Sequence, residues 1–136
     1  MQAAILLEKL AIYEEEIDRR QVVARRYADA LASAVAIPRV PEGCVSVWAQ
    51  YTLTARDNAQ RERIRTALQA AGIPSAIYYP RPLHLQTAYA DFPRDPRGLE
   101  TAERLAERVL SLPMHPYLDA ADQEEIVSAV LQGARE

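Results

Sequence analysis

The sequence predicts an α/β (α+β) domain in which helices cover one face of a small sheet. Four segments are predicted helices, because they carry apolar residues at helical spacing or clear capping residues. Only a few short segments show the alternation of apolar and polar residues that is typical of strands. Few strands at wide spacing, with helices between them, indicate a small sheet that helices cover.

Residues 2 to about 35 are predicted to form one long helix, because apolar residues repeat there with spacings of four and three. Arg20 stands where this repeat expects another apolar residue. The apolar run at residues 5–7 is wider than one stripe, so we expect this first turn to be buried on more than one side. No capping residue precedes the repeat, which indicates a chain taken from something longer. The repeat consists of Leu6, Leu10, Tyr13, Ile17, Ala24, Tyr27 and Leu31.

Two segments are predicted strands. Pro38 and Pro41 end the long helix, and residues 45–54 then alternate between apolar and more polar side chains, which predicts a strand with one wet face. Residues 75–79 are expected to form a short second strand. Residues 111–116 are expected to form an extended piece bracketed by prolines.

Three further helices are predicted after the first strand. The first of them ends at Gly72, a residue type that suits a helix C-terminus, and the second spans residues 98–110. Asp57 or Asn58 is expected to cap the first of these helices, and Asp119 or Asp122 the last. The apolar face of the middle helix consists of Leu99, Ala102, Leu105, Ala106 and Val109, and that of the last helix of Ile126, Val127, Val130 and Leu131.

Composition and charge argue against several classes of function. The net charge of −3 argues against nucleic acid or an acidic membrane as the main partner. No apolar run approaches the roughly 20 residues that span a bilayer, and no signal peptide is expected. The single cysteine, Cys44, excludes an internal disulfide framework and suits a reducing compartment such as the cytoplasm. The two histidines and this cysteine lack ligand spacing, so no metal site is expected.

The densest group of functional side chains lies at residues 78–86, with the sequence YYPRPLHLQ. The prolines keep this segment extended or turned, and binding residues concentrate on such loops. His84 is the strongest candidate, with two open interpretations: a bond to an anionic ligand group, or a bond to the backbone. Arg81 either pairs with a carboxylate or phosphate or is solvated. Tyr78 and Tyr79 are expected to face opposite sides, one the core and the other a pocket.

Other polar residues give weaker signals. His115 has apolar neighbours and is expected to be packed and structural. Arg20 is expected to be either a buried, ion-paired arginine or the partner of a helix acid in a salt bridge. The serines have no histidine and aspartate partners at a recognisable spacing, so a hydrolytic triad is unsupported. The four glycines are not clustered, so no glycine-rich phosphate loop is present.

Short motifs occur in order along the chain at residues 2–10, in Arg20-x-x-x-Ala24-x-x-Tyr27, and at residues 47–51, 72–73, 79–89 and 111–116. In this order they resemble the DegT/DnrJ/StrS family of nucleotide-sugar aminotransferases, which depend on pyridoxal 5'-phosphate (PLP). The resemblance covers essentially the whole chain. Among subfamilies, the sequence looks most similar to the enzymes that aminate a 3-keto UDP-N-acetylglucosaminuronic acid for O-antigen assembly.

This resemblance implies a fold-type I aminotransferase in which a large domain comes first and binds PLP. It implies that residues 1–35 are a long connecting helix and that residues 36–136 are the small, substrate-side C-terminal domain, with the PLP-binding domain absent from this chain. The family's Schiff-base lysine lies upstream, and Lys9, the only lysine here, does not match its motif. We therefore expect no catalytic, cofactor-binding or metal-binding residue in this chain and no transamination by the chain alone.

By the same resemblance, the segment at residues 78–86, here called the proline-rich loop, approaches the substrate. Tyr79 and His84 are expected to contact the sugar nucleotide or the carboxylate of the amino donor, and Gln86 belongs to the same motif. Arg81 has no firm counterpart in the family, so its role in binding is inferred from its charge. The implied reaction moves an amino group from glutamate to a keto nucleotide sugar, in a cytoplasmic homo-oligomer. The alternative is a non-catalytic family remnant that serves as a dimerisation or regulatory module.

Overall fold

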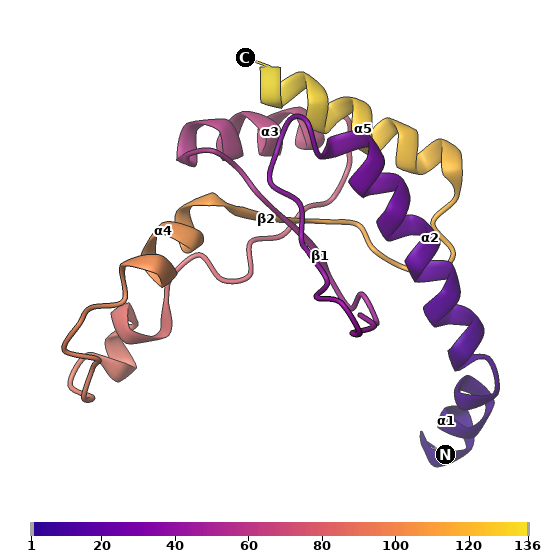
Figure 1. Cartoon of the computed structure of the whole chain (residues 1–136), viewed down its shortest axis with the longest axis horizontal. Coiled ribbons are helices and arrows are strands. Elements are labelled where there is room, and N and C mark those ends of the chain that lie inside the picture. Colours follow the sequence, from indigo (N-terminus) through magenta and orange to yellow (C-terminus); the bar gives the residue numbers. More distant parts are fainter. Residues whose placement is uncertain (1, 136) are drawn as a thin grey trace.

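The computed structural model describes residues 2–135 and shows a small sheet beneath three helices, α2, α3 and α5 (Figure 1). This arrangement confirms the predicted fold class. The helices are α1 (Gln2–Ala11), α2 (Tyr13–Leu31), α3 (Asn58–Ala70), α4 (Glu100–Arg108) and α5 (Ala120–Arg135), with short 3-10 helices η1 (Leu83–Leu85) and η2 (Thr87–Tyr89). The strands are β1 (Tyr51–Thr54) and β2 (Val109–Leu112).

Strand β2 lies at the centre of the sheet. On one edge it pairs antiparallel with β1, where Leu53 stands opposite Leu110. On the other edge, the backbones of Ser111 and Ala76 exchange two hydrogen bonds of 2.7 and 3.1 Å. The strand predicted at residues 75–79 is therefore a single bridge. The proline-rich loop follows at once and cannot extend a ladder, because prolines lack the backbone N–H.

Residues 45–50, predicted as part of a strand, do not pair with another strand. Instead, Gln21 Nε2 donates to the carbonyl of Ser46 at 2.6 Å, and the Arg20 guanidinium donates to the carbonyl of Trp48 at 3.0 Å. Trp48 also has a left-handed φ of 48°, which is incompatible with a regular strand. Arg20 was predicted to form an ion pair in the core or a salt bridge with a helix acid. Both predictions are wrong, because the Arg20 guanidinium bonds to a backbone carbonyl rather than to an acid.

The helix predicted over residues 2–35 is divided in two. Ile12 separates α1 from α2 with φ −112° and ψ 4°, and its N–H bonds to the carbonyl of Lys9, one residue short of an α-helical bond. The α2 helix ends at Leu31, where two following N–H groups turn back onto its carbonyl. Helix α1 contains no buried residue, so the expected burial of residues 5–7 is wrong within this chain. Their apolar side chains find no covering partner among residues 2–135.

The caps of α3 and α5 agree with the prediction. The Asp57 carboxylate accepts from the N–H of Gln60 at 2.7 Å, and the Asp119 carboxylate accepts from the N–H of Asp122 at 2.8 Å. Each satisfies an N–H group that a helix start leaves without a partner. Gly72 follows α3 with a φ of 71°, as a helix-ending glycine does.

One hydrophobic core joins α2, the sheet, α3 and α5. The backbones of α3 and α5 approach closely at Gly133, where an added Cβ would lie 2.6 Å from the Cα of Ile64. No helix within residues 2–135 is both long and apolar enough to cross a membrane. The largest fully buried side chains are Tyr27, Tyr51, Leu31, Leu53, Ile64, Leu68, Leu110, Val23 and Val130.

Candidate functional site

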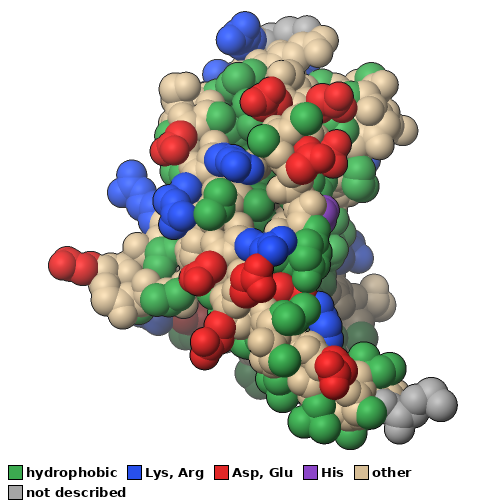
Figure 2. Space-filling model, turned by 90° about the vertical axis from the view of Figure 1, so that its right-hand side faces the viewer, with side chains coloured by type: hydrophobic (Ala, Val, Ile, Leu, Met, Phe, Trp, Pro, Cys, Tyr) green, Lys and Arg blue, Asp and Glu red, His purple; other side chains and the backbone are tan. Residues whose placement is uncertain are grey.

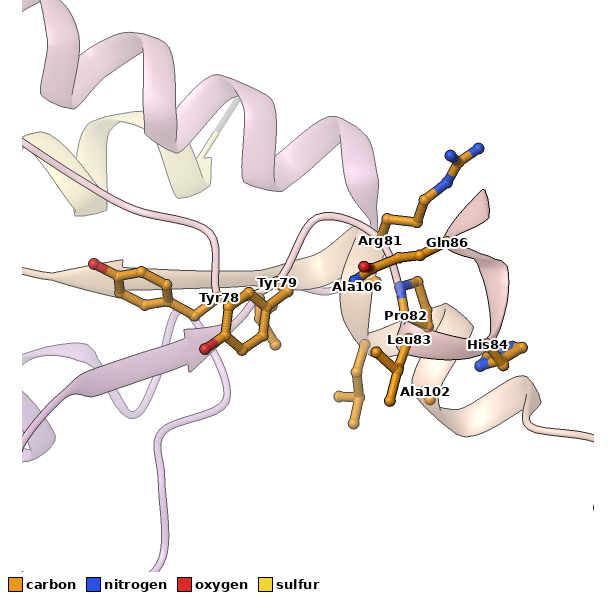
Figure 3. A pocket seen from close by; sticks show the side chains of 11 residues that line it. Tyr78, Tyr79, Arg81, Pro82, Leu83, His84, Gln86, Ala102 and Ala106 are labelled. Carbon is orange, nitrogen blue, oxygen red and sulfur yellow. The ribbon is translucent and has the colours of Figure 1, made fainter. Parts of the chain in front are cut away.

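A pocket of about 650 Å³ lies between the proline-rich loop and helix α4 (Figure 3). Its volume falls in the range of small-molecule binding sites. The loop contributes all four residues predicted as a binding site, namely Tyr79, Arg81, His84 and Gln86, together with Tyr78. The structure therefore brings together the side chains that the sequence singled out. Their part in binding stays a prediction.

Helix α4 and the first residue of β2 form the apolar wall of this pocket, through Ala102, Leu105, Ala106 and Val109. These residues belong to the apolar face that was predicted for the helix at residues 98–110. Of these α4 residues only Ala106 is buried, and Leu105 remains 42% exposed. The apolar face of α4 thus borders a pocket as well as the core. The helix ends at Arg108, since the chain enters β2 directly after it.

The two tyrosines do not divide between the core and the pocket as expected. Tyr78 is 48% exposed and Tyr79 is 72% exposed, and both line the pocket. Their rings meet edge to face with centroids 6.0 Å apart, a favourable geometry for aromatic pairs. The period-two alternation fails here because residues 75–79 form no continuous strand. Both rings are therefore available at one end of the pocket (Figure 3).

His84 lies on η1, away from the tyrosines in the pocket lining (Figure 3). Its Nε2 is 2.9 Å from Oε1 of Glu103 on α4, and its side chain is only 12% exposed. Glu103 was not among the predicted site residues. The two residues are far apart in the chain, so no local spacing could reveal the pair. The contact is neither of the two that we expected, because it joins His84 to a carboxylate of the chain itself.

Arg81 contrasts with His84. Its side chain is exposed and extends away from the tyrosines (Figure 3). Among residues 2–135, no hydrogen bond or salt bridge engages its guanidinium. A guanidinium of this kind can form a bidentate pair with a carboxylate or a phosphate.

The second histidine lies outside this pocket. His115 is exposed rather than packed as expected, and its Nδ1 accepts a hydrogen bond from the N–H of Tyr117 at 3.2 Å. Its apolar sequence neighbours did not predict this exposure, because His115 begins a turn that the N–H of Leu118 closes onto its carbonyl at 3.3 Å. Within the described part of the chain, no three acidic, histidine or cysteine side chains gather in a way that could hold a metal ion.

A family model matches residues 1–131, nearly the whole chain. The chain belongs to the DegT/DnrJ/EryC1/StrS aminotransferase family. This confirms the resemblance seen in the motifs. Aminotransferases of this family bind PLP.

Three relatives illustrate the similarity. The UDP-2-acetamido-2-deoxy-3-oxo-D-glucuronate aminotransferase of Pseudomonas aeruginosa is 45% identical over 96% of this chain and 35% of its own length. The crystal structure of a DegT/DnrJ/EryC1/StrS aminotransferase from Brucella abortus superimposes with a TM-score of 0.90 at 51% identity, over 95% of this chain and 34% of the other. The structure of DesV of S. venezuelae, in complex with a ketimine intermediate, superimposes with a TM-score of 0.91 at 33% identity. The match covers 100% of this chain and 36% of DesV.

The chain thus spans about a third of the length of these relatives. Lys9 is the one lysine of this chain. Its Nζ lies 2.5 Å from Oε1 of Glu16, and this hydrogen bond raises the pKa of Lys9. An amine acts as a nucleophile only after losing its proton, so this contact opposes imine formation. We assign no step of PLP chemistry to this chain.

Proposed function

We propose that this chain is the substrate-side small domain of a PLP-dependent aminotransferase that transfers an amino group from glutamate to a keto nucleotide sugar. The observation that carries the proposal is the similarity to the P. aeruginosa glucuronate aminotransferase across nearly the whole chain. The pocket supports it, because it combines a cation, a phenol, an imidazole and an amide with an apolar wall. Such a set suits a ligand that is both charged and rich in hydroxyl groups.

The proposed substrate is a UDP-linked 3-keto sugar acid, and each pocket residue has a part in holding it. Arg81 would pair with a phosphate or carboxylate of the substrate. Tyr79 and Gln86 would bond to sugar hydroxyl groups, and His84 would contact the same ligand. PLP, when bound by the whole enzyme, supplies the electron sink for amino transfer. This chain's own residues would bind and orient the sugar.

The proposal includes the remaining expectations for the whole protein. Residues 1–35 would connect to a PLP-binding domain, residues 36–136 would form the substrate side, and the enzyme would be a cytoplasmic homo-oligomer. Helix α2 nevertheless shares one core with α3 and α5, so the two parts are expected to move as one body.

An activity assay tests this function. The product of the longest in-frame gene that contains this sequence should carry a lysine upstream of it. Incubated with PLP, glutamate and UDP-2-acetamido-2-deoxy-3-oxo-D-glucuronate, that protein should form 2-oxoglutarate and an amino sugar nucleotide. A longer protein that binds PLP but aminates no keto nucleotide sugar would contradict the substrate class.

A non-catalytic module is the alternative, and the exposed apolar residues of α1 favour it. Ile5, Leu6, Leu7 and Leu10 are each at least 60% exposed, as on a helix that docks onto another body. A gene in which no lysine-bearing domain precedes this sequence would favour the module over the enzyme.

Lys9 provides a separate prediction. We expect that this chain, mixed with PLP and reduced with borohydride, shows no stoichiometric label on Lys9, because the hydrogen bond to Glu16 raises the pKa of the Lys9 ammonium and so disfavours the free amine. Mass spectrometry of the tryptic peptides measures the label. Full labelling at Lys9 would show that our interpretation of this contact is wrong.

A further inference from the structure

The two ring nitrogens of His84 have different surroundings. Nε2 lies 2.9 Å from Oε1 of Glu103. Nδ1 has no hydrogen-bond partner among residues 2–135, and the ring belongs to the pocket lining. Nδ1 is therefore the only ring nitrogen that His84 can offer to a ligand.

The chemistry of Glu103 decides what Nδ1 can do. An ionised carboxylate only accepts hydrogen bonds, so the nitrogen that faces it must carry a proton. In a neutral imidazole one nitrogen donates and the other accepts. With Nε2–H facing Glu103, Nδ1 of the neutral ring becomes an acceptor. Among residues 2–135, His84 is the only side chain that forms a hydrogen bond or an ion pair with this carboxylate.

We propose that Glu103 is a positioning residue that fixes neutral His84 with its proton on Nε2, so that the ring accepts a hydrogen bond from the ligand at Nδ1. The partner of Nδ1 would then be a hydroxyl or amino group rather than an anion. This inference rests on the proposed function, in which that group belongs to the sugar of a nucleotide sugar. Arg81 would bind the anionic part of the same ligand.

A purely structural role for the pair is the competing explanation. His84 is on η1 and Glu103 on α4, so their contact also ties the loop to the helix. Such a tie also places the proton of wild-type His84 on Nε2, because this nitrogen faces the carboxylate. The Glu103→Ala variant separates the two explanations: loss of a tie lowers the melting temperature, whereas loss of a positioning contact lets the proton exchange between the two ring nitrogens of a chain that stays folded.

Nitrogen NMR on this chain, labelled with 15N in histidine, tests the proposal without any ligand. The spectra are recorded at about pH 8.5, well above the usual imidazole value near 6.5. The chain has two histidines, so His115 serves as an internal reference. For His84 we expect two well-separated ring resonances, a protonated Nε2 and an unprotonated Nδ1. In Glu103→Ala they should move toward each other, as the proton begins to exchange between both nitrogens, while those of His115 stay in place.

Glu107→Gln is the matched control, because Glu107 is exposed one turn further along α4 and its side chain does not contact His84. It should leave both histidines unchanged. The proposal is overturned if wild-type His84 carries its proton on Nδ1, carries two protons, or shows averaged resonances. It is also overturned if a folded Glu103→Ala variant keeps the wild-type pattern. The NMR experiment needs no nucleotide sugar, so its result is independent of the aminotransferase assay. The proposal about His84 can therefore be overturned while the assay succeeds, and it can hold while the assay fails.

Discussion

Arg81 and His84 lie in one loop, yet their surroundings give them different chemistry. The guanidinium of Arg81 is exposed and has no protein partner within residues 2–135. The imidazole of His84 is nearly covered and already bonded to Glu103. An exposed side chain without contacts adds little to stability, so a substitution there reports on binding alone. Arg81 is therefore the cleaner probe of the proposed site.

In the proposed enzyme, Arg81→Ala should lower kcat/KM by about ten- to hundredfold, since a charge-assisted hydrogen bond contributes roughly 1.5–3 kcal/mol. The melting temperature should not change. Arg94→Ala is the control, because Arg94 is an exposed arginine between η2 and α4 that bonds only to the carbonyl of Ala90 and does not line the pocket. Steady-state kinetics of both variants with the nucleotide sugar make the comparison. Equal effects of the two substitutions would remove Arg81 from the site.

The buried tyrosines offer a second matched pair. The Tyr27 hydroxyl donates to the carbonyl of Pro113 at 2.9 Å, whereas the buried Tyr51 hydroxyl has no partner within residues 2–135. Tyr27→Phe should therefore cost roughly 1–2 kcal/mol of unfolding free energy, because it leaves an acceptor without its donor. Tyr51→Phe should cost nothing or stabilise the fold. Urea denaturation measures both, and a larger loss for Tyr51→Phe would contradict the assigned bonds.

The same two residues set an alkaline limit to stability. Burial raises the pKa of Tyr51 to about 12, from an ordinary value of 10.0, and raises that of Tyr27 as well. Between these values the unfolded chain releases protons that the folded chain retains, so stability is complete below pH 10 and falls as the pH rises toward 12. Denaturation midpoints at increasing pH should show this decline. The Tyr27→Phe/Tyr51→Phe double variant should show a weaker decline, and an equal one would contradict the assignment.

At the scale of elements, the sequence predicted best what depends on local rules. Asp57, Asp119 and Gly72 were expected at helix ends and occupy them, because capping depends on a few neighbouring residues. The extent of the strands could not be predicted. Residues 45–50 read as a strand, but their carbonyls are taken by side chains of α2.

The candidate site shows the same division. Its loop could be found from residue types and prolines, whereas Glu103 comes from a separate helix and is brought close only by the fold. The apolar face of α4 was also visible as a pattern. Spacing alone could not show that this face borders a pocket, because the same periodicity describes helices that pack on a core.

The contact between α3 and α5 gives the prediction that belongs to elements. Gly133→Ala should destabilise the fold by roughly 1–3 kcal/mol, because the new Cβ would meet the backbone of Ile64 at 2.6 Å and no side-chain rotation can relieve that clash. Alanine favours a helix over glycine by about 1 kcal/mol at most, which is too little to offset the clash. Gln132→Ala, at an exposed neighbouring position of α5, is the control. Thermal and urea denaturation measure the stability of both variants. A Gly133→Ala protein as stable as wild type would refute the close approach of the two helices.

At the scale of the whole molecule, the surface is uneven. Hydrophobic side chains gather at the end of the molecule where α1 lies, whereas charged side chains of both signs are interspersed over the helices further up (Figure 2). Helix α1 has no buried residue, and its side-chain link to the described remainder is the Lys9–Glu16 pair. The fold therefore does not depend on α1, and α1 is free to present an apolar surface.

The last prediction follows from that surface. The isolated chain should self-associate at high concentration or bind a dye for exposed apolar surface, since contiguous apolar patches mark interaction surfaces. Leu6→Gln/Leu10→Gln should weaken both effects, because these side chains are 61% and 65% exposed and glutamine keeps the helix. The melting temperature should stay the same, as α1 adds nothing to the core. Val45→Gln, which removes a single residue that is 78% exposed outside α1, should change neither effect. Light scattering and dye fluorescence measure the outcome, and a wild-type chain that stays monomeric and binds no dye would contradict an interaction surface on α1.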